Sequence, residues 1–159
     1  MNEIYQTYYN SPLGQIELTG TKEGIISIMF REDGEQTKDI PVVLAECYQQ
    51  IDEYFQGKRH SFSFNYVLNG TEFQNKVWAE LAKIPYGETV SYKNIAEGIG
   101  NVKAIRAVGR ANGKNMLNIV IPCHRVIGAN GSLTGYGGGL WRKEWLINHE
   151  QKNMGCSKM

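Results

Sequence analysis

The sequence predicts two small domains of different class: an α/β domain over residues 1–68 and a mostly helical domain with a helix-turn-helix over residues 69–159. In the first 68 residues, short segments of alternating apolar and polar side chains surround one helical pattern. From Thr71 onward, helical patterns follow one another, and a glycine turn joins two of them. The charge divides at the same point, with 5 Lys+Arg and 10 Asp+Glu before it and 12 Lys+Arg and 6 Asp+Glu after it.

The charge division is the first indication of function. The whole chain of 159 residues has a formal net charge of only +1, which by itself suggests no partner. The excess of cations in the second half predicts a polyanionic partner for that half. With 42% hydrophobic and 21% charged residues, the chain has the composition of an ordinary globular protein.

Several classes are excluded by what the sequence lacks. The longest apolar runs, residues 24–30 and 119–123, are too short to span a bilayer, and the N-terminus lacks the pattern of a signal peptide. Three widely spaced cysteines make no disulfide framework and suit a reducing cytoplasm. Together with the three histidines they match no zinc spacing, so we expect no metal and no cofactor.

The elements of the first domain follow from local patterns. Residues 11–14 form a turn, and a hairpin follows, with strands around Ile16 and Leu18 and over residues 25–30. Residues 31–40 are a polar loop. Pro41 then occupies a first helical position, apolar side chains recur at helical spacing, and Gly57 ends the helix. Residues 61–67 alternate again and are predicted to form a returning strand. Cys47 lies on the apolar face of this helix, as a buried and inert thiol.

The second domain begins with a capping box, Thr71 with Gln74, that starts a helix with Trp78 in its core. Ser91 caps a short helix over residues 92–99, and Asn101 caps a second helix that runs to about Ala111. This second helix combines small side chains with cations at positions 103, 106 and 110. Small side chains let a helix approach a groove closely, and cations meet phosphates. The alternative is a solvated basic helix.

The reactive residue proposed by the sequence is Cys123. It lies within an apolar run and directly before His124 and Arg125, an electropositive setting that favours a thiolate. If this segment is extended, Cys123 and His124 point to opposite faces, so proton transfer between them requires a bridging water. The alternative is that Cys123 is a small core residue.

A glycine-rich loop and a last helix complete the domain. Five glycines between residues 131 and 139 indicate a loop of close backbone approach that carries Tyr136. The helix over residues 140–150 offers Trp141, Trp145 and Leu146 to the core. Glu150 is either a partly buried carboxylate that orients a histidine or a solvated terminal residue. We expect a mobile tail from about residue 151, which contains Cys156.

Together these segments resemble the O6-alkylguanine-DNA alkyltransferases, the methylated-DNA–protein-cysteine methyltransferase family. The resemblance is carried from about residue 70 to residue 150 by the following segments: Val90-Ser91-Tyr92, Arg106-Ala107-Val108-Gly109, Asn115, Pro122-Cys123-His124-Arg125, Tyr136, Lys143-Glu144-Trp145-Leu146 and His149-Glu150. The first half is similar more loosely, through Ser11-Pro12-Leu13-Gly14 and Tyr54-Phe55-x-Gly57.

The resemblance implies a ribonuclease-H-like first domain and a winged-helix-type second domain that binds DNA from the minor groove. It implies suicidal, single-turnover transfer of an alkyl group from O6-alkylguanine, and from O4-methylthymine, in duplex DNA to Cys123. The protein would act as a monomer, without a cofactor or a membrane, in the cytoplasm or on a prokaryotic nucleoid.

The resemblance also assigns roles to residues. His124 is the base that acts through a water, Glu150 holds it, and Asn115 braces the turn before the cysteine. Arg106 replaces the flipped nucleotide in the stack, and Tyr92 extrudes the base and donates to its ring nitrogen. The further DNA-binding positions are Ala107, Arg110, Lys103 and Asn112, and the base pocket is lined by Tyr136, Val126, Gly137 and Pro122. Two positions depart from the family: Gly137 replaces a common serine and Met116 a common proline.

Three other functions fit parts of the sequence. A non-catalytic lesion binder of the alkyltransferase-like kind lacks the cysteine, so the presence of Cys123 is evidence against it. A winged-helix transcription regulator leaves the Cys-His-Arg segment without a role. A Cys-His hydrolase would turn over repeatedly, whereas a thioether offers water no activated carbonyl to attack.

Overall fold

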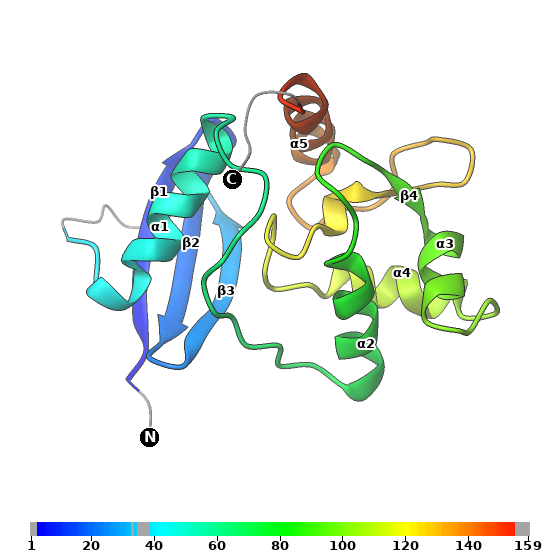
Figure 1. The fold of residues 1–159 in the computed structure, drawn as a ribbon, viewed down its shortest axis with the longest axis horizontal. Helices are drawn as coiled ribbons and strands as arrows, with labels where there is room; N and C mark the ends of the chain where they lie inside the picture. Colours follow the sequence, from blue (N-terminus) through cyan, green and yellow to red (C-terminus); the bar gives the residue numbers. More distant parts are fainter. Residues whose placement is uncertain (1–2, 33, 35–38, 155–159) are drawn as a thin grey trace. The chain divides into compact units, whose positions relative to one another are not determined.

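The computed structural model describes residues 3–32, 34 and 39–154, and these residues form two compact units. One unit lies within residues 3–68 and the other within residues 69–154 (Figure 1). Each unit has a core of its own and is described separately below. Within the described residues, no helix has both the length and the apolarity that a membrane span needs.

The first unit is built on a three-stranded antiparallel sheet in the order β1-β2-β3, with β1 at Tyr5–Ser11, β2 at Gly14–Thr21 and β3 at Gly24–Arg31. The predicted hairpin is confirmed as β2 and β3, with Ile16 opposite Phe30. Strand β1 was not singled out by pattern, because its buried side chains are Thr7 and Tyr9 rather than aliphatic residues.

Helix α1 (Val42–Phe55) packs against β1 and β2 (Figure 1). Its apolar face buries Leu44 and Ile51 completely, which is what the helical spacing predicts. Pro41 is the N-cap and not the first helical residue, since its ψ of 140° is extended. The helix therefore begins one residue later than predicted.

The strand predicted over residues 61–67 is wrong. This segment makes a single parallel bridge, between Ile25 and Tyr66, in which the amide of Ile25 donates to Asn65 and the amide of Val67 donates to Ile25. Its alternation instead places Phe64 in the core. A segment that pairs through one residue covers the edge of β3 without extending the sheet.

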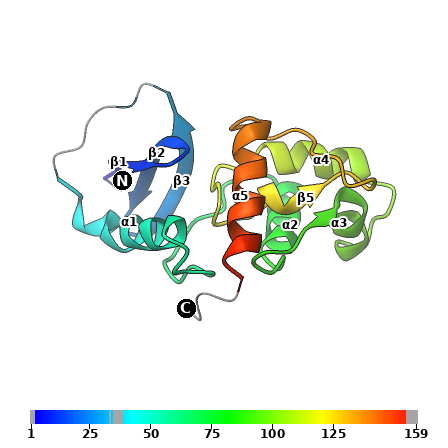
Figure 2. The same ribbon diagram turned by 90° about the horizontal axis from the view of Figure 1, so that it is seen from above.

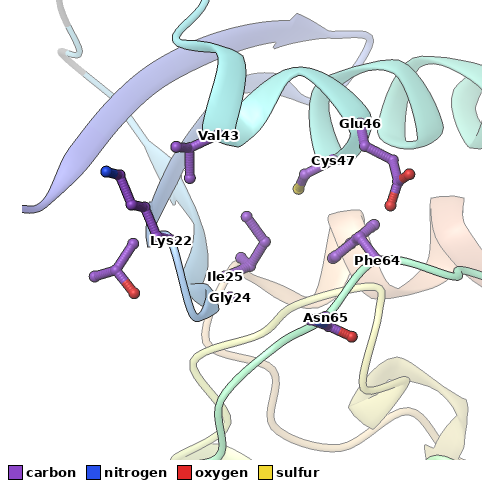
Figure 3. A pocket seen from close by; sticks show the side chains of 9 residues that line it. Lys22, Gly24, Ile25, Val43, Glu46, Cys47, Phe64 and Asn65 are labelled. Atoms are coloured by element: carbon purple, nitrogen blue, oxygen red, sulfur yellow. The ribbon is translucent and has the colours of Figure 1, made fainter. Parts of the chain in front are cut away.

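A cavity of about 260 Å³ lies beside α1, and Cys47 contributes to its wall together with Ile25 and Phe64 (Figure 3). Burial raises the pKa of the Cys47 thiol to about 12. The thiol is thus protonated at neutral pH, in agreement with the inert role predicted for it.

The second unit begins with α2 (Glu72–Leu81), whose predicted capping box is present: Thr71 Oγ1 accepts from the Gln74 amide, and Gln74 Oε1 accepts from the Thr71 amide. Trp78 is buried as predicted. Its indole nitrogen donates to the carbonyl of Ala111 at 2.8 Å, so this side chain ties α2 to the helix that carries the basic residues.

The helix-turn-helix is formed by α3 (Tyr92–Gly98) and α4 (Ile105–Gly113), which pack against each other (Figure 2). Ser91 caps α3 as predicted. The cap predicted at Asn101 is wrong: the N-cap is Ala104, three residues later, and it makes no side-chain hydrogen bond. Lys103 therefore lies in the turn and not on the helix.

A two-stranded parallel pair, β4 (Val90–Ser91) and β5 (Val126–Ile127), lies beside α5 (Leu140–Lys152) in Figure 2. Leu146 is buried on α5 as predicted, but Trp141 is 58% exposed, so its assignment to the core is wrong. Helix α5 continues through residue 152, past the predicted start of the tail. Cys156 and the other residues from 155 to 159 lie outside the described residues.

Candidate functional site

The segment before Cys123 is a series of tight turns. Ile119 has a φ of +74°, and the amide of Val120 donates to the carbonyl of Asn118 at 2.8 Å, which makes Ile119 the centre of a strained three-residue turn. Pro122 (φ −80°, ψ 64°) is the centre of a second such turn, in which the amide of Cys123 donates to Ile121. A positive φ is costly for a β-branched residue, so the surrounding packing must impose it.

This geometry corrects the extended segment considered for residues 121–127. Cys123–Arg125 is one turn of 3₁₀ helix (η1), and only Val126–Ile127 is a strand. The structure places no hydrogen bond between the thiol of Cys123 and the ring of His124. Proton transfer between them therefore still requires an intermediary such as a water. The reason first given for this, that the two side chains point to opposite faces of a strand, does not apply.

Asn115 holds these turns in place. Its Nδ2 donates to the carbonyl of Ile121 at 2.8 Å, and its Oδ1 accepts from the amide of Leu117 at 2.9 Å. This is the bracing position that the resemblance implies. The neighbouring Met116 is 51% exposed, so the side chain that replaces the common proline points away from the brace.

Asn112 lies elsewhere than predicted. It was assigned to the DNA-binding face, but it is only 3% exposed, and its Nδ2 donates to the carbonyl of Cys123 at 3.4 Å. Its amide therefore supports the backbone of the cysteine from the inner side of α4. The exposed face of that helix carries other residues.

The thiol of Cys123 is buried, with 4% of the residue exposed, and its Sγ lies 3.9 Å from Oδ1 of Asn118. Burial raises the pKa of this thiol, while a hydrogen bond from Asn115 and the positive charge of Lys143 lower it. The net effect is a raised pKa, so the buried thiol is protonated at neutral pH and needs a base to become the thiolate, which Asn115 and Lys143 then favour.

His124, Arg125 and Glu150 form a buried polar cluster, which decides the alternatives left open for Glu150. Its Oε2 lies 2.6 Å from Nε2 of His124, and its Oε1 accepts from Nε of Arg125 at 2.7 Å. Arg125 also donates through Nη2 to Oε2 and through Nη1 to the carbonyl of Ile84. Glu150 is 1% exposed and therefore is not a solvated terminal residue.

The charges in this cluster determine which nitrogen of His124 can act as a base. Although burial opposes it, the hydrogen bonds from His124 and Arg125 and the positive charge of Arg125 hold the pKa of Glu150 far below its usual range, so the carboxylate accepts hydrogen bonds only. Nε2 of His124 must then carry the proton. Burial lowers the pKa of His124 below its usual value even though Glu150 opposes this, which leaves the ring neutral at pH 7. Its Nδ1 is buried without a hydrogen-bond partner and is the available base.

These shifts predict that the protein loses stability on acidification. Because the folded-state pKa of His124 is lowered, the unfolded chain binds a proton below about pH 6.5 that the folded chain does not. Glu150 adds a second loss below about pH 4.3 for the same reason. Urea unfolding between pH 7 and pH 4 should show a falling free energy of unfolding, by up to about 1.4 kcal/mol per pH unit for each group. A flat or rising profile would contradict the assignment of a neutral histidine.

Of the four residues predicted to line the base pocket, two flank the cysteine in sequence and two lie in the glycine-rich loop. Pro122 and Val126 flank η1 and are buried. The hydroxyl oxygen of Tyr136 is buried, and burial raises the pKa of this phenol well above 10, so it is neutral. Gly137 is exposed, and a Cβ there would meet no atom within 4 Å, so the common serine would fit without a clash.

Lys143 and Thr134 are site residues that patterns did not identify. Lys143 is fully buried on α5, where its Nζ donates to the carbonyl of Thr134 at 2.7 Å. Burial lowers the pKa of Lys143 to about 8, opposed by the charge of Cys123. The hydroxyl of Thr134 lies 2.8 Å from that of Tyr92. Lysines are almost never fully buried unless they are paired. A lysine on the inward face of the predicted last helix was therefore the signal that could have identified Lys143 from the sequence.

The exposed face of α4 carries two cations, Arg106 and Arg110, and Lys114 follows the helix at the same spacing. The structure gives none of the three an ion pair or side-chain hydrogen bond among the described residues. Arg110 and Lys114 line a groove of about 280 Å³ between α4 and the start of α2, with Ala107 and Gln74 in its walls. Arg125, in contrast, is buried against Glu150 and is not part of this exposed face.

The described residues include no group of three or more His, Cys, Asp or Glu side chains placed to hold a metal ion. The described residues of the site offer a buried thiol, a neutral imidazole held by a carboxylate, and a cationic helix face.

Comparison with protein families gives two matches that together span most of the chain. Residues 72–152 match the DNA-binding domain of 6-O-methylguanine DNA methyltransferase, and residues 4–66 match its ribonuclease-like domain. The two-domain fold predicted from the sequence, a ribonuclease-like domain followed by a helical DNA-binding domain, is confirmed.

Individual proteins are similar over nearly their whole length. A methylated-DNA–protein-cysteine methyltransferase of Methanosarcina acetivorans is 45% identical over 92% of this chain and 98% of its own, and the constitutive enzyme of Bacillus subtilis is 43% identical over 92% and 95%. The crystal structure of Mycobacterium tuberculosis O6-methylguanine methyltransferase matches with a TM-score of 0.85 and 41% identity over 95% of this chain and 94% of that one. The M. tuberculosis OGT structure in complex with DNA matches with a TM-score of 0.85 and 42% identity over 92% of each chain.

Proposed function

Because the chain belongs to the 6-O-methylguanine DNA methyltransferase family, we propose that it repairs duplex DNA directly, by accepting the alkyl group of O6-alkylguanine on Sγ of Cys123. One observation supports this most strongly. The buried thiol lies next in sequence to a histidine whose Nε2 is held by Glu150 at 2.6 Å and whose Nδ1 is without a partner. That arrangement supplies both a nucleophile and a base.

The reaction begins with base flipping, since the methyl group on guanine O6 is inside the base stack. Flipping costs a few kcal/mol, and least for a base that pairs badly. Arg106 is exposed on α4 and fills the space that the nucleotide leaves. Pro122, Val126, Tyr136 and Gly137 then receive the base.

The chemical step transfers one alkyl group and one proton. The thiol proton moves through a water to Nδ1 of His124, and the thiolate attacks the alkyl carbon. A new S–C bond forms as the C–O bond breaks, and its electron pair remains on guanine O6. Tyr92 donates a hydrogen bond to the ring nitrogen as negative charge develops on the guanine. The thioether product cannot be hydrolysed readily, so each chain acts once and needs no cofactor.

DNA binding is assigned to the exposed cations of α4 and the preceding turn. The side chains of Arg106, Arg110 and Lys103 are exposed. The small side chain of Ala107 lets the helix approach the DNA closely. The groove of about 280 Å³ beside Arg110 and Lys114 can receive a phosphate group. Because the chain's formal net charge is only +1, non-specific binding should be weak and should depend only weakly on salt.

Substitutions on α4 should separate two kinds of contact. Arg110→Gln removes a phosphate contact, so it should reduce the slope of log affinity against log salt concentration by about one for all duplexes. Arg106→Gln should instead slow alkyl transfer more than it weakens binding to undamaged DNA. Fluorescence anisotropy across a salt series measures the first effect. Lys22→Gln, in the other unit, is the matched control, and an equal change of slope in that variant would contradict the assignment.

We further propose that the protein acts as a monomer, accepts methyl from O4-methylthymine as well, and works in the cytoplasm, on the nucleoid if the source is prokaryotic. A reactive thiol is best kept reduced there. The decisive experiment is a titration of a duplex containing one O6-methylguanine with increasing protein. The amount of guanine restored should equal the amount of protein added and then stop. Restoration that continues beyond one lesion per chain would contradict single-turnover repair and favour a hydrolase.

A further inference from the structure

The loop between β5 and α5 is anchored at Thr134 by two hydrogen bonds. The hydroxyl of Thr134 lies 2.8 Å from the hydroxyl of Tyr92, and its carbonyl accepts from Nζ of Lys143 at 2.7 Å. One residue therefore joins the first position of α3 to the buried face of α5. The rest of this loop is rich in glycine, so it offers few other side chains for such contacts.

The ring of Tyr92 is restrained from a second direction by α4. A Cβ at Gly109 would lie 3.9 and 4.0 Å from ring carbons of Tyr92, so the phenol lies against the helix where that helix has no side chain. A tyrosine at the start of a seven-residue helix otherwise has several rotamers available. The surface at Gly109 positions the ring, and Thr134 positions the hydroxyl.

Lys143 explains why Thr134 itself stays in place. Its ammonium group is fully buried, and the carbonyl of Thr134 is the one hydrogen-bond acceptor that the described structure provides for it. An ammonium group has three donors, so loss of this acceptor would leave a buried charge without a hydrogen bond. The Lys143 contact therefore keeps the backbone of Thr134 at a defined distance from α5.

We propose that Thr134 is a positioning residue for Tyr92 in alkyl transfer, with its hydroxyl backing the phenol while the phenol meets the flipped base. This inference rests on the proposed function. When the phenol donates a hydrogen bond to the ring nitrogen of the departing guanine, its oxygen gains partial negative charge. The Thr134 hydroxyl donates to that oxygen and strengthens the outer hydrogen bond. No proton needs to leave Thr134, so the reaction's balance is unchanged.

A double-mutant cycle tests this coupling. Thr134→Val keeps the shape of the side chain and the backbone carbonyl that accepts from Lys143, and Tyr92→Phe removes the phenol oxygen. We expect Thr134→Val to lower the single-turnover rate constant on an O6-methylguanine duplex by about 2- to 12-fold, the range of one net hydrogen bond. In the Tyr92→Phe background the same substitution should have no further effect. Thr134→Ser, which restores the hydroxyl, should recover most of the rate.

Three outcomes would overturn the inference. These are a wild-type rate in Thr134→Val, the same fold loss in the Tyr92→Phe background, or no recovery in Thr134→Ser. The thermal midpoint of each variant, measured in parallel, shows whether the substitution has only made the loop less stable. A less stable loop would lower the rate constant by the same factor in the wild-type and Tyr92→Phe backgrounds. Failure of the proposed function can be told apart from failure of this inference, because the wild-type protein would then restore no guanine in the same assay.

Discussion

Cys123→Ala is expected to abolish alkyl transfer to the protein while leaving affinity for a methylated duplex close to that of the wild type. The reason is that the substitution removes the sulfur that forms the new bond, while the exposed cations of α4 remain in place. The measurement is a gel assay in which the methyl group on the DNA carries a radioactive label. Label should move to the wild-type protein and not to the variant.

Cys47→Ala is the matched control for this substitution. Cys47 is as deeply buried as Cys123, and burial raises the pKa of both thiols, but only Cys123 has a hydrogen bond from Asn115 and the charge of Lys143 to oppose this; the pKa of Cys47 is raised to about 12, and it lies in the other unit. It should accept no label, and its removal should leave transfer unchanged at a small cost in stability. Label on the Cys123→Ala protein would show that another residue is the acceptor.

Glu150→Gln is expected to reduce both stability and transfer rate. Glu150 accepts hydrogen bonds from His124, from two nitrogens of Arg125 and from the amide of Gly87, all in a site that is almost completely buried. Removing one partner of a buried ion pair costs about 3–5 kcal/mol, because the other charge is left uncompensated. Glutamine keeps one acceptor oxygen, for which His124 and Arg125 compete, and presents an NH2 donor in place of the other, so the tautomer of His124 is no longer fixed.

Urea unfolding at neutral pH measures the first effect, and single-turnover kinetics at a temperature where the variant is folded measures the second. Glu144→Gln is the matched control, since Glu144 is exposed on the same helix. If the free energy of unfolding of Glu150→Gln falls by an amount within 1 kcal/mol of the fall in Glu144→Gln, the buried cluster does not have the importance for stability assigned to it here.

Local signals in the sequence predicted local structure well. The N-caps Thr71 and Ser91 are signals of this kind, since each side chain and the amide that it caps are three residues apart. The helix-turn-helix followed from the Ser91 cap and the glycine turn. Asn101 shows the limit: it is a good capping residue by type, but the N-cap of α4 is Ala104, three residues later.

The parts of the site that could not be predicted depend on contacts between distant residues. The ion pair of Arg125 could not be predicted because its partner, Glu150, is 25 residues away in sequence. Asn112 was assigned to the DNA-binding face through the resemblance alone, and its contact with the carbonyl of Cys123, 11 residues away, has no local signal. The positive φ of Ile119 has no sequence signal, since the residue type opposes it. The individual roles assigned to Arg106, Tyr92 and Tyr136 stay predictions until variants are measured.

The measurement that tests the central claim most directly is the intact mass of the protein after incubation with a duplex containing O6-methylguanine. Each chain should gain the mass of one methylene group, the gain should persist after the DNA is removed, and peptide mapping should locate it on Cys123. Restoration of guanine without any change in protein mass would contradict the proposal that this chain consumes its own cysteine.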